Sequence, residues 1–247
     1  MYTRQMRGIL SLLVFLAFLY NGQANASQSM PITATSWLVA DGNGKIIDGS
    51  NTTQVRSIAS ISKLMTAMIV LDAKQDLDEY IKPYTRRELL QLAIVHSDNK
   101  ATEMLCNNYP GGRTECIRAL NTKSKFLNLP NTRFTEPTGL SVFNVSTAEE
   151  LVQMVITASH YPEIVIAAKT SEVKIKIKRK WLIFRNTNPI IGQRHDFIVS
   201  KTGYIRASGG CIVMMLDTDI GRRIVVVLGS KNTKTRIPEA EFIAKKY

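Results

Sequence analysis

Hydrophobic and polar positions alternate at the start of the folded part of the chain. Two short strand-like runs, residues 37–40 and 45–47, are separated by Asp-Gly-Asn-Gly at residues 41–44. Glycine and asparagine readily adopt the positive φ angles that a tight turn between antiparallel strands requires. The pattern therefore predicts a β-hairpin near the amino terminus.

The middle of the chain has helical periodicity. From residue 58 to about residue 75, apolar side chains recur every three or four positions, as a helix buried on one face requires. These side chains are Ile61, Leu64, Met65, Met68 and Ile69. Residues 85–88 (Thr-Arg-Arg-Glu) and 146–149 (Ser-Thr-Ala-Glu) each match a capping box, so two more helices are expected to begin there.

Strand patterns return after Pro162. Residues 173–178 alternate apolar side chains with lysines, the period of a strand with one face in solvent. Runs at 198–202, 211–216 and 223–228 predict three more strands, and Pro238 suits the first position of a closing helix. Strands at both ends enclosing helices predict one α+β unit, in which the amino-terminal hairpin and the carboxy-terminal meander share an antiparallel sheet.

The first 26 residues have a different character. Arg4 and Arg7 precede an apolar run at residues 9–19, and Ala24-Asn25-Ala26 supplies the small residues of a signal-peptide cleavage site. A transmembrane anchor is the alternative, but a bilayer requires about 20 apolar residues and this run is shorter. We therefore expect residues 1–26 to be a signal peptide. Residues 27–247 would be the mature domain, exported to the periplasm without a stable membrane anchor.

Composition narrows the partners and cofactors of the mature domain. The chain has 32 Lys and Arg against 20 Asp and Glu, a net charge of +12 that becomes +10 once Arg4 and Arg7 are removed. A basic protein favours acidic partners, and we expect no nucleic acid among them. The three cysteines and three histidines lack metal-ligand spacing, so we expect no metal and no cofactor.

The cysteines have separate expectations. Cys106 and Cys116 flank a turn, and outside the cytoplasm they either form a disulfide or remain thiols; the sequence leaves both open. Cys211 alternates with apolar strand residues and is expected to be a small buried side chain.

One candidate for chemistry lies where the first helix begins. Ser60 and Lys63 are three residues apart, which places a hydroxyl and an amine on one helix face. The positive end of the helix dipole favours an anion beside Ser60. Ser-x-x-Lys is a weak signal alone, because an ordinary helix start is a sufficient explanation and Ser171 with Lys174 repeats the spacing.

Two further motifs make the signal specific. Ser97-Asp98-Asn99 interrupts two helical stretches, and Lys201-Thr202-Gly203 lies on a late predicted strand. Ser-x-x-Lys, Ser-Asp-Asn and Lys-Thr-Gly in this order and context are the motif set of penicillin-binding proteins and class A β-lactamases.

Longer stretches extend this resemblance to a family. Residues 56–67 (Arg-Ser-Ile-Ala-Ser-Ile-Ser-Lys-Leu-Met-Thr-Ala) resemble the nucleophile segment of low-molecular-mass penicillin-binding proteins. Residues 109–112, 132–141, 144–147 and 184–188 are similar to the type-7 members, which are periplasmic D-alanyl-D-alanine endopeptidases. The resemblance implies a β-lactamase/DD-peptidase-like fold, a DD-peptidase catalytic domain over residues 27–247, peptidoglycan stem peptides as substrate and β-lactam antibiotics as covalent inhibitors.

The residues can be given roles within that chemistry. Ser60 is the expected nucleophile and Lys63, as a neutral amine, its base, with Lys201 as a second cation that lowers the pKa of Lys63. Ser97 is expected to bridge the two lysines and pass a proton to the leaving amine. Among the substrate-binding residues, Asn99 is expected to bind a substrate amide, and Lys201 with Thr202 a substrate carboxylate. Gly203 is expected to leave the strand unobstructed for the substrate. The N–H of Tyr204 is expected to form an oxyanion hole together with the N–H of Ser60.

The pattern leaves alternatives open. D-alanyl-D-alanine carboxypeptidase action uses the same residues, and a serine β-lactamase would additionally need a placed carboxylate, for which Glu136, Glu149 and Glu150 are available. Residues 74–85 look shorter than their family counterpart, which also makes a non-catalytic cell-wall binding protein conceivable.

Overall fold

The computed structural model describes residues 30–193 and 196–247, so the expected signal peptide at residues 1–26 lies outside the described residues. The strands are β1 (Ser36–Asp41), β2 (Ile46–Ser50), β3 (Arg56–Ser57), β4 (Tyr80–Ile81), β5 (Tyr84–Thr85), β6 (Val145–Ser146), β7 (Glu172–Ile177), β8 (Lys180–Arg185), β9 (Phe197–Ile205), β10 (Gly209–Thr218) and β11 (Gly221–Ser230). The helices are α1 (Ser62–Asp72), α2 (Arg86–Gln91), α3 (Asn99–Asn107), α4 (Gly112–Phe126), α5 (Ala148–Ala158), α6 (Pro162–Lys169) and α7 (Arg236–Lys246), with a 3₁₀ turn η1 (Ala59–Ile61) and a π-helical segment η2 (Leu92–His96).

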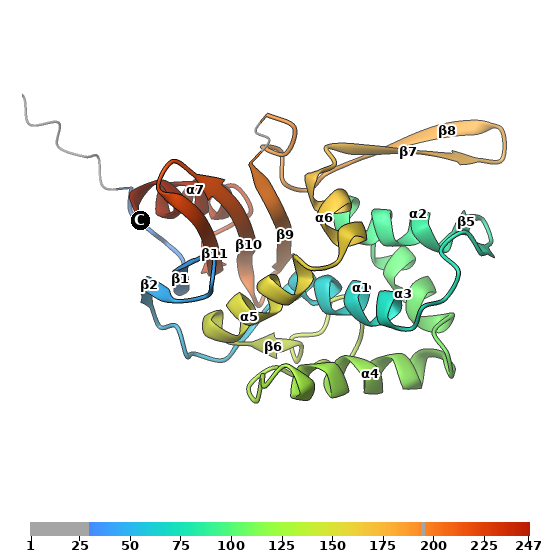
Figure 1. Cartoon of the computed structure of the whole chain (residues 1–247), viewed down its shortest axis with the longest axis horizontal. Helices are drawn as coiled ribbons and strands as arrows, with labels where there is room; N and C mark the ends of the chain where they lie inside the picture. Colours follow the sequence, from blue (N-terminus) through green and yellow to red (C-terminus); the bar gives the residue numbers. More distant parts are fainter. Residues whose placement is uncertain (1–29, 194–195) are drawn as a thin grey trace, which may run out of the picture. The chain divides into compact units, whose positions relative to one another are not determined.

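The main sheet joins the two ends of the folded chain. Its strand order is β2-β1-β11-β10-β9, and every neighbouring pair is antiparallel. β1 pairs with β11 in a register that places Ser36 opposite Leu228, and β10 pairs with β9 so that Cys211 lies opposite Gly203. The predicted union of the amino-terminal hairpin with the carboxy-terminal meander is confirmed, with β9 at one edge of the sheet (Figure 1).

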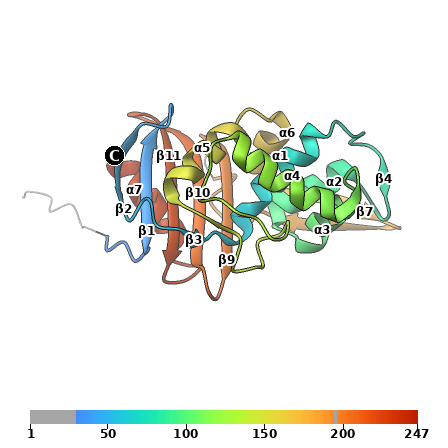
Figure 2. The ribbon, with the colours of Figure 1, turned by 90° about the horizontal axis from the view of Figure 1, so that it is seen from below.

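Helices cover both faces of this sheet. In β10, Cys211 and Val213 belong to the core shared with α1 and α5, whereas Ile212 and Met214 pack in a second core with α7. Two covered faces explain why this strand is apolar at successive positions and not at alternate ones. Helices α2 to α4 lie beyond the β9 edge of the sheet (Figure 2).

The helix starts test the capping predictions. Thr85 and Glu88 form the predicted capping box of α2. The cap of α5 is Thr147, whose hydroxyl accepts from the Glu150 N–H, so the prediction at 146–149 was wrong by one residue. Pro238 is the third residue of α7 and not the first, because the helix already begins at Arg236.

Two of the three cysteines form a disulfide. Cys106 at the end of α3 and Cys116 in α4 form a disulfide, with their Cα atoms 5.4 Å apart. Both cysteines are fully buried, so the bond lies inside the core that carries α1. Cys211 is a free, buried thiol, as predicted, and burial raises its pKa.

The strand predicted at residues 173–178 is β7, but it does not join the main sheet. It pairs with β8, which the sequence pattern did not reveal, in a separate two-stranded ribbon. Lys174 and Lys176 are exposed while Val173 and Ile175 are buried, as the alternation predicts.

Membrane-spanning potential was assessed for the part of the chain that the structure describes. No single helix there is long and apolar enough to cross a bilayer, although α5 and α6 together, bent by 104° at their junction, satisfy the same length and composition criteria.

Candidate active site

Ser60 and Lys63 lie on consecutive turns at the start of α1. Ser60 belongs to η1, and the Lys63 Nζ donates a hydrogen bond of 2.9 Å to its Oγ. The preceding Ala59 has a φ of +48°, an uncommon conformation for a residue with a side chain. Gly139 packs directly against it, since a Cβ at Gly139 would lie 1.9 Å from the Ala59 carbonyl oxygen. The nucleophile turn is therefore held in a strained conformation by a close backbone contact.

Lys63 is buried among acceptors from three separate segments. Besides Ser60, its Nζ donates to the Asn99 Oδ1 at 2.7 Å and to the Thr138 carbonyl oxygen at 2.6 Å. Burial lowers the pKa of Lys63 to about 8, although the negative charges of Glu136 and Asp98 act in the opposite direction and raise it. At pH 7 about a tenth of such an amine is neutral, whereas an exposed lysine is almost entirely charged. Lys63 is thus prepared for the role of a base.

The Ser-Asp-Asn segment connects η2 to α3. Ser97 has a φ of +59°, and the Asp98 carboxylate caps α3 by accepting from the Ala101 N–H at 2.7 Å. This reversal of the backbone places Asn99 beside Lys63. Within the described residues, the Ser97 hydroxyl forms no hydrogen bond, so its bridge between the two lysines stays a prediction.

Lys201 on β9 is, like Lys63, almost completely buried. Its Nζ donates to the Thr202 carbonyl oxygen at 3.0 Å, and burial lowers its pKa well below the usual range, with further lowering by the charges of Lys63 and Arg236. The lowered pKa of Lys63 has burial as its cause and not Lys201. Lys201 is thus not among the causes of the lowered pKa of Lys63, whereas the charge of Lys63 does lower the pKa of Lys201.

The edge strand β9 lies against the nucleophile turn. A Cβ on Gly203 would lie 2.9 Å from the Ser60 nitrogen and 3.0 Å from the Ala59 Cβ. Gly203 is therefore required for close packing, in addition to the unobstructed strand expected from the sequence. Tyr204 follows on the strand and is 47% exposed, and the Thr202 hydroxyl donates to the Thr187 hydroxyl at 2.6 Å.

Arg236 was not identified from the sequence as a residue of the site. Its Nη1 donates to the Gly203 carbonyl oxygen at 2.7 Å, and its side chain is buried next to Lys201. It is the first residue of α7, where the positive end of the helix dipole disfavours a cation. An arginine in the first turn of the predicted closing helix, where a cation is unfavourable, is the sequence signal that could have pointed to a binding role.

Glu136 was considered as a deacylating carboxylate, but the structure gives it a different task. Its oxygens accept from the N–H groups of Thr138 at 2.7 Å, Gly139 at 2.6 Å and Ser141 at 3.2 Å. The carboxylate therefore shapes the loop that supplies the Thr138 carbonyl to Lys63.

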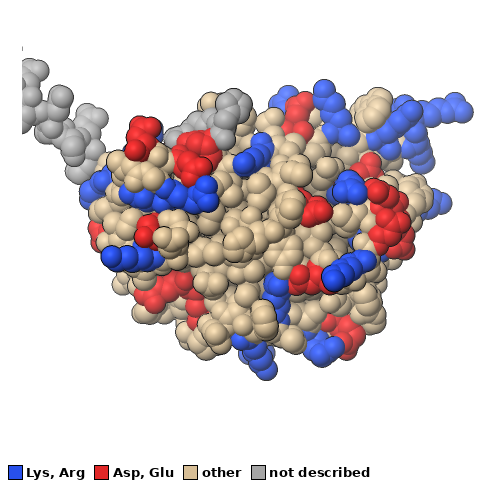
Figure 3. All heavy atoms as spheres, viewed as in Figure 1, with Lys and Arg blue, Asp and Glu red and all other residues tan. Residues whose placement is uncertain are grey.

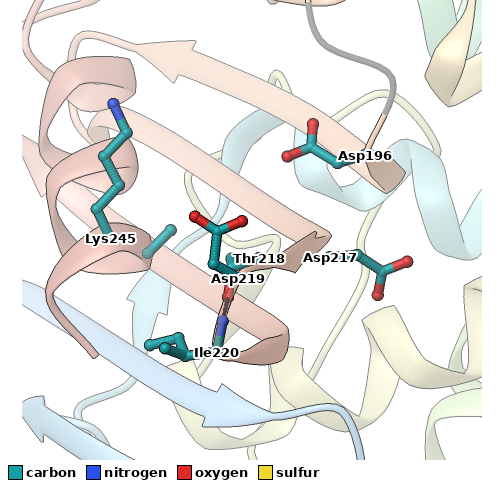
Figure 4. A pocket seen from close by; sticks show the side chains of 7 residues that line it. Asp196, Asp217, Thr218, Asp219, Ile220 and Lys245 are labelled. Atoms are coloured by element: carbon teal, nitrogen blue, oxygen red, sulfur yellow. Dashed lines mark hydrogen bonds between the residues drawn. The ribbon is translucent and has the colours of Figure 1, made fainter.

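A hollow at the other end of β9 contains acidic side chains. Figure 4 shows Asp219 pointing between Asp196 and Lys245, while Asp217 points away toward its ion pair with Arg222. Among the described residues, no group of three or more His, Cys, Asp and Glu side chains is arranged to hold a metal ion.

Comparisons with known proteins agree with this geometry. A family model described as D-alanyl-D-alanine carboxypeptidase matches residues 23–80 and 77–232. The D-alanyl-D-alanine endopeptidase of Escherichia coli is 38% identical over 83% of this chain and 76% of its own length, and that of Pseudomonas aeruginosa is 35% identical over 85% and 75%.

Solved structures share the fold. A mutant of the Streptomyces K15 DD-transpeptidase has a TM-score of 0.80 and 24% identity, covering 87% of this chain and 98% of its own. The cefotaxime-bound penicillin-binding protein D2 of Listeria monocytogenes has a TM-score of 0.76 and 24% identity, covering 87% and 97%. With the motifs, the fold and these relatives in agreement, the chain belongs to the S11 peptidase family of D-alanyl-D-alanine carboxypeptidases.

Proposed function

We propose that this chain is an exported serine DD-peptidase that cuts D-alanyl-diaminopimelate cross-links in peptidoglycan through an acyl-serine intermediate. The observation that carries the proposal is the 2.9 Å contact between the Ser60 hydroxyl and the buried amine of Lys63, whose pKa is about 8. The E. coli and P. aeruginosa relatives, both named D-alanyl-D-alanine endopeptidases, support the cross-link specificity.

The reaction begins with attack of the Ser60 Oγ on the carbonyl carbon of a D-alanyl residue. The neutral Lys63 amine takes the hydroxyl proton, and the N–H groups of Ser60 and Tyr204 stabilise the oxyanion. Ser97 returns a proton to the leaving amine, and water then releases the acyl group from Ser60.

Lys201 acts on the substrate carboxylate. A carboxylate that binds between Lys201 and Thr202 favours the protonated lysine, because a nearby opposite charge raises the pKa of an amine. The buried Arg236 beside Lys201 adds a permanent positive charge next to the proposed carboxylate site. These positive charges therefore favour substrates with a free carboxylate, as peptidoglycan stem peptides have.

The three candidate carboxylates all accept hydrogen bonds from other parts of the protein, which disfavours a role in rapid β-lactam hydrolysis. Glu136 holds its own loop, Glu149 accepts from the Thr52 hydroxyl at 2.6 Å, and Glu150 accepts from the Asn131 N–H at 2.8 Å. Each of the three thus has a structural partner that accounts for its position without a deacylating water. β-Lactams are therefore inhibitors in this proposal, in line with the Listeria protein solved in cefotaxime-bound and ampicillin-bound forms.

Export to the periplasm is part of the proposal. The Cys106–Cys116 disulfide supports it, because such bonds persist mainly outside the cytoplasm. Cleavage after Ala26 would leave Ser27 as the first residue of the mature enzyme.

Penicillin should acylate Ser60 and leave Ser171 unmodified, although each serine has a lysine three positions later. Lys63 has a lowered pKa and lies within hydrogen-bond distance of Ser60, whereas Lys174 forms an ion pair with Glu172. Mass spectrometry of the intact protein and its peptides should show the adduct on Ser60, lost in Ser60→Ala and kept in the matched control Ser171→Ala. Labelling that survives Ser60→Ala would refute the assignment of the nucleophile.

Acylation should accelerate with rising pH. Only the neutral Lys63 amine can take the proton, so with its pKa at about 8 the rate at saturating penicillin should rise about tenfold per pH unit below pH 8 and level off above it. Stopped-flow or quenched acylation at a series of pH values measures this. A rate that does not change across this range would mean that another group is the base.

The two lysines should respond differently to arginine. Lys63→Arg should lower acylation roughly 10²–10⁴-fold, because a guanidinium stays protonated and cannot serve as a base. Lys201→Arg keeps a cation and should retain part of the acylation rate while binding substrate more weakly. Thermal unfolding checks that both variants fold, and an equal loss of rate in two folded variants would contradict the division of roles.

Cross-linked muropeptide dimers should be converted to monomers by the purified enzyme. Chromatography of the digest measures the products, and Ser60→Ala is the control that should abolish them. Release of terminal D-alanine alone would make the enzyme a carboxypeptidase, and rapid penicillin hydrolysis would make it a β-lactamase. A folded protein that binds dimers without cleaving them would be the non-catalytic alternative.

A further inference from the structure

The β7–β8 pair is a basic ribbon that stands apart from the main sheet. Residues 172–185, here called the ribbon, contain six Lys and Arg against one Glu. In Figure 1 the two strands extend beyond α6 and α2, and in Figure 3 blue side chains gather over the same end of the molecule. None of the catalytic residues belongs to the ribbon.

The two faces of the ribbon differ. On the inner face, Val173 and Ile175 are buried in the main core. The outer face carries the cross-strand pairs Lys174 with Ile183 and Lys176 with Trp181. Exposed lysines and bulky apolar side chains therefore share one surface, with further cations at the turn, Lys178, Arg179 and Lys180.

The apolar side chains of this outer face are unusually accessible. Trp181 is 64% exposed and Ile183 is 55% exposed, while the Lys176 ammonium lies 5.9 Å from the centre of the Trp181 ring. Tryptophan beside aliphatic side chains and cations is the combination that enters the headgroup region of a bilayer, where the cations meet lipid phosphates.

We propose that the ribbon docks this protein reversibly on an anionic lipid surface. The cations attract lipid phosphates, and Trp181 and Ile183 enter the interface. Carboxylates of peptidoglycan would pair with the lysines but leave Ile183 exposed. A second copy of the chain would be repelled, because each ribbon carries the same excess of positive charge.

The carboxy-terminal end of the ribbon and the residues that follow it connect this surface to the active site. The Phe184 ring makes an edge contact with His96, their centroids 5.4 Å apart, and the Thr187 N–H donates to the Val95 carbonyl oxygen at 3.0 Å. Thr187 in turn contacts Thr202. A protein bound through the ribbon would therefore hold its active site at a fixed position relative to the lipid surface.

Vesicle binding by the full mature protein tests the proposal. Vesicles of phosphatidylglycerol and phosphatidylethanolamine should sediment the protein, and salt should weaken this, whereas phosphatidylcholine vesicles should not. The fluorescence of Trp181 should shift to the blue on binding, and Trp181→Phe should lose most of this shift while it still binds. The other tryptophan, Trp37, packs against Tyr247 and contributes a constant background.

Matched variants assign the binding to the ribbon. Lys174→Gln with Lys176→Gln should weaken partitioning roughly 30-fold, while Lys45→Gln with Lys125→Gln, an equal change of charge elsewhere, should have little effect. Trp181→Ser with Ile183→Ser should also abolish most binding. Phe126→Ser, which removes an 81% exposed side chain on α4, is the control for apolar exposure. Thermal unfolding verifies that each variant is folded.

Three results would overturn the proposal. They are absence of binding to anionic vesicles, vesicle binding that the ribbon variants leave unchanged, and ribbon-dependent binding to isolated peptidoglycan sacculi without binding to vesicles. None of these measurements uses peptidase activity, so their outcome is independent of the proposed function.

Discussion

The buried ammonium of Lys63 is the contact on which the organisation of the active site depends. A cation without partners in a protein interior is strongly destabilising, so its surroundings must provide acceptors. They come from η1 through Ser60, from α3 through Asn99 and from the loop between α4 and β6 through Thr138. The amine thereby joins segments that are far apart in sequence, and the same burial that makes these contacts necessary brings its pKa close to neutral.

Close backbone packing positions the nucleophile against the sheet. Gly139 on one side and Gly203 on the other leave no space for a Cβ near the Ala59–Ser60 turn. A larger residue at either position would require the backbone to move, and Gly139 also has a φ of +84°. The distance between Ser60 and β9 is thus determined by main-chain contacts, which vary less than contacts between long side chains.

Much of this arrangement could be predicted from the sequence. The strand patterns gave the sheet, because alternation and turn residues are local signals, and the three short motifs identified Ser60, Lys63 and Lys201. Other features depend on tertiary contacts that no local pattern contains. The lowered pKa of Lys63 depends on its burial in the folded protein. Arg236 reaches the Gly203 carbonyl only because α7 packs on β10 and β11. β8 lacks the alternation of a strand with one buried face, because most of its side chains are exposed.

The stretch from residue 74 to residue 85 lies outside the network that performs the chemistry. The two segments matched by the family model meet at residues 77–80, within this stretch. The fully buried Arg86 holds it in place through an ion pair with Glu79 and a hydrogen bond to the Asp76 carbonyl oxygen. No acceptor of Lys63 and no contact of Lys201 comes from it. A difference from relatives in this stretch therefore leaves the hydrogen bonds of Lys63 and Lys201 in place.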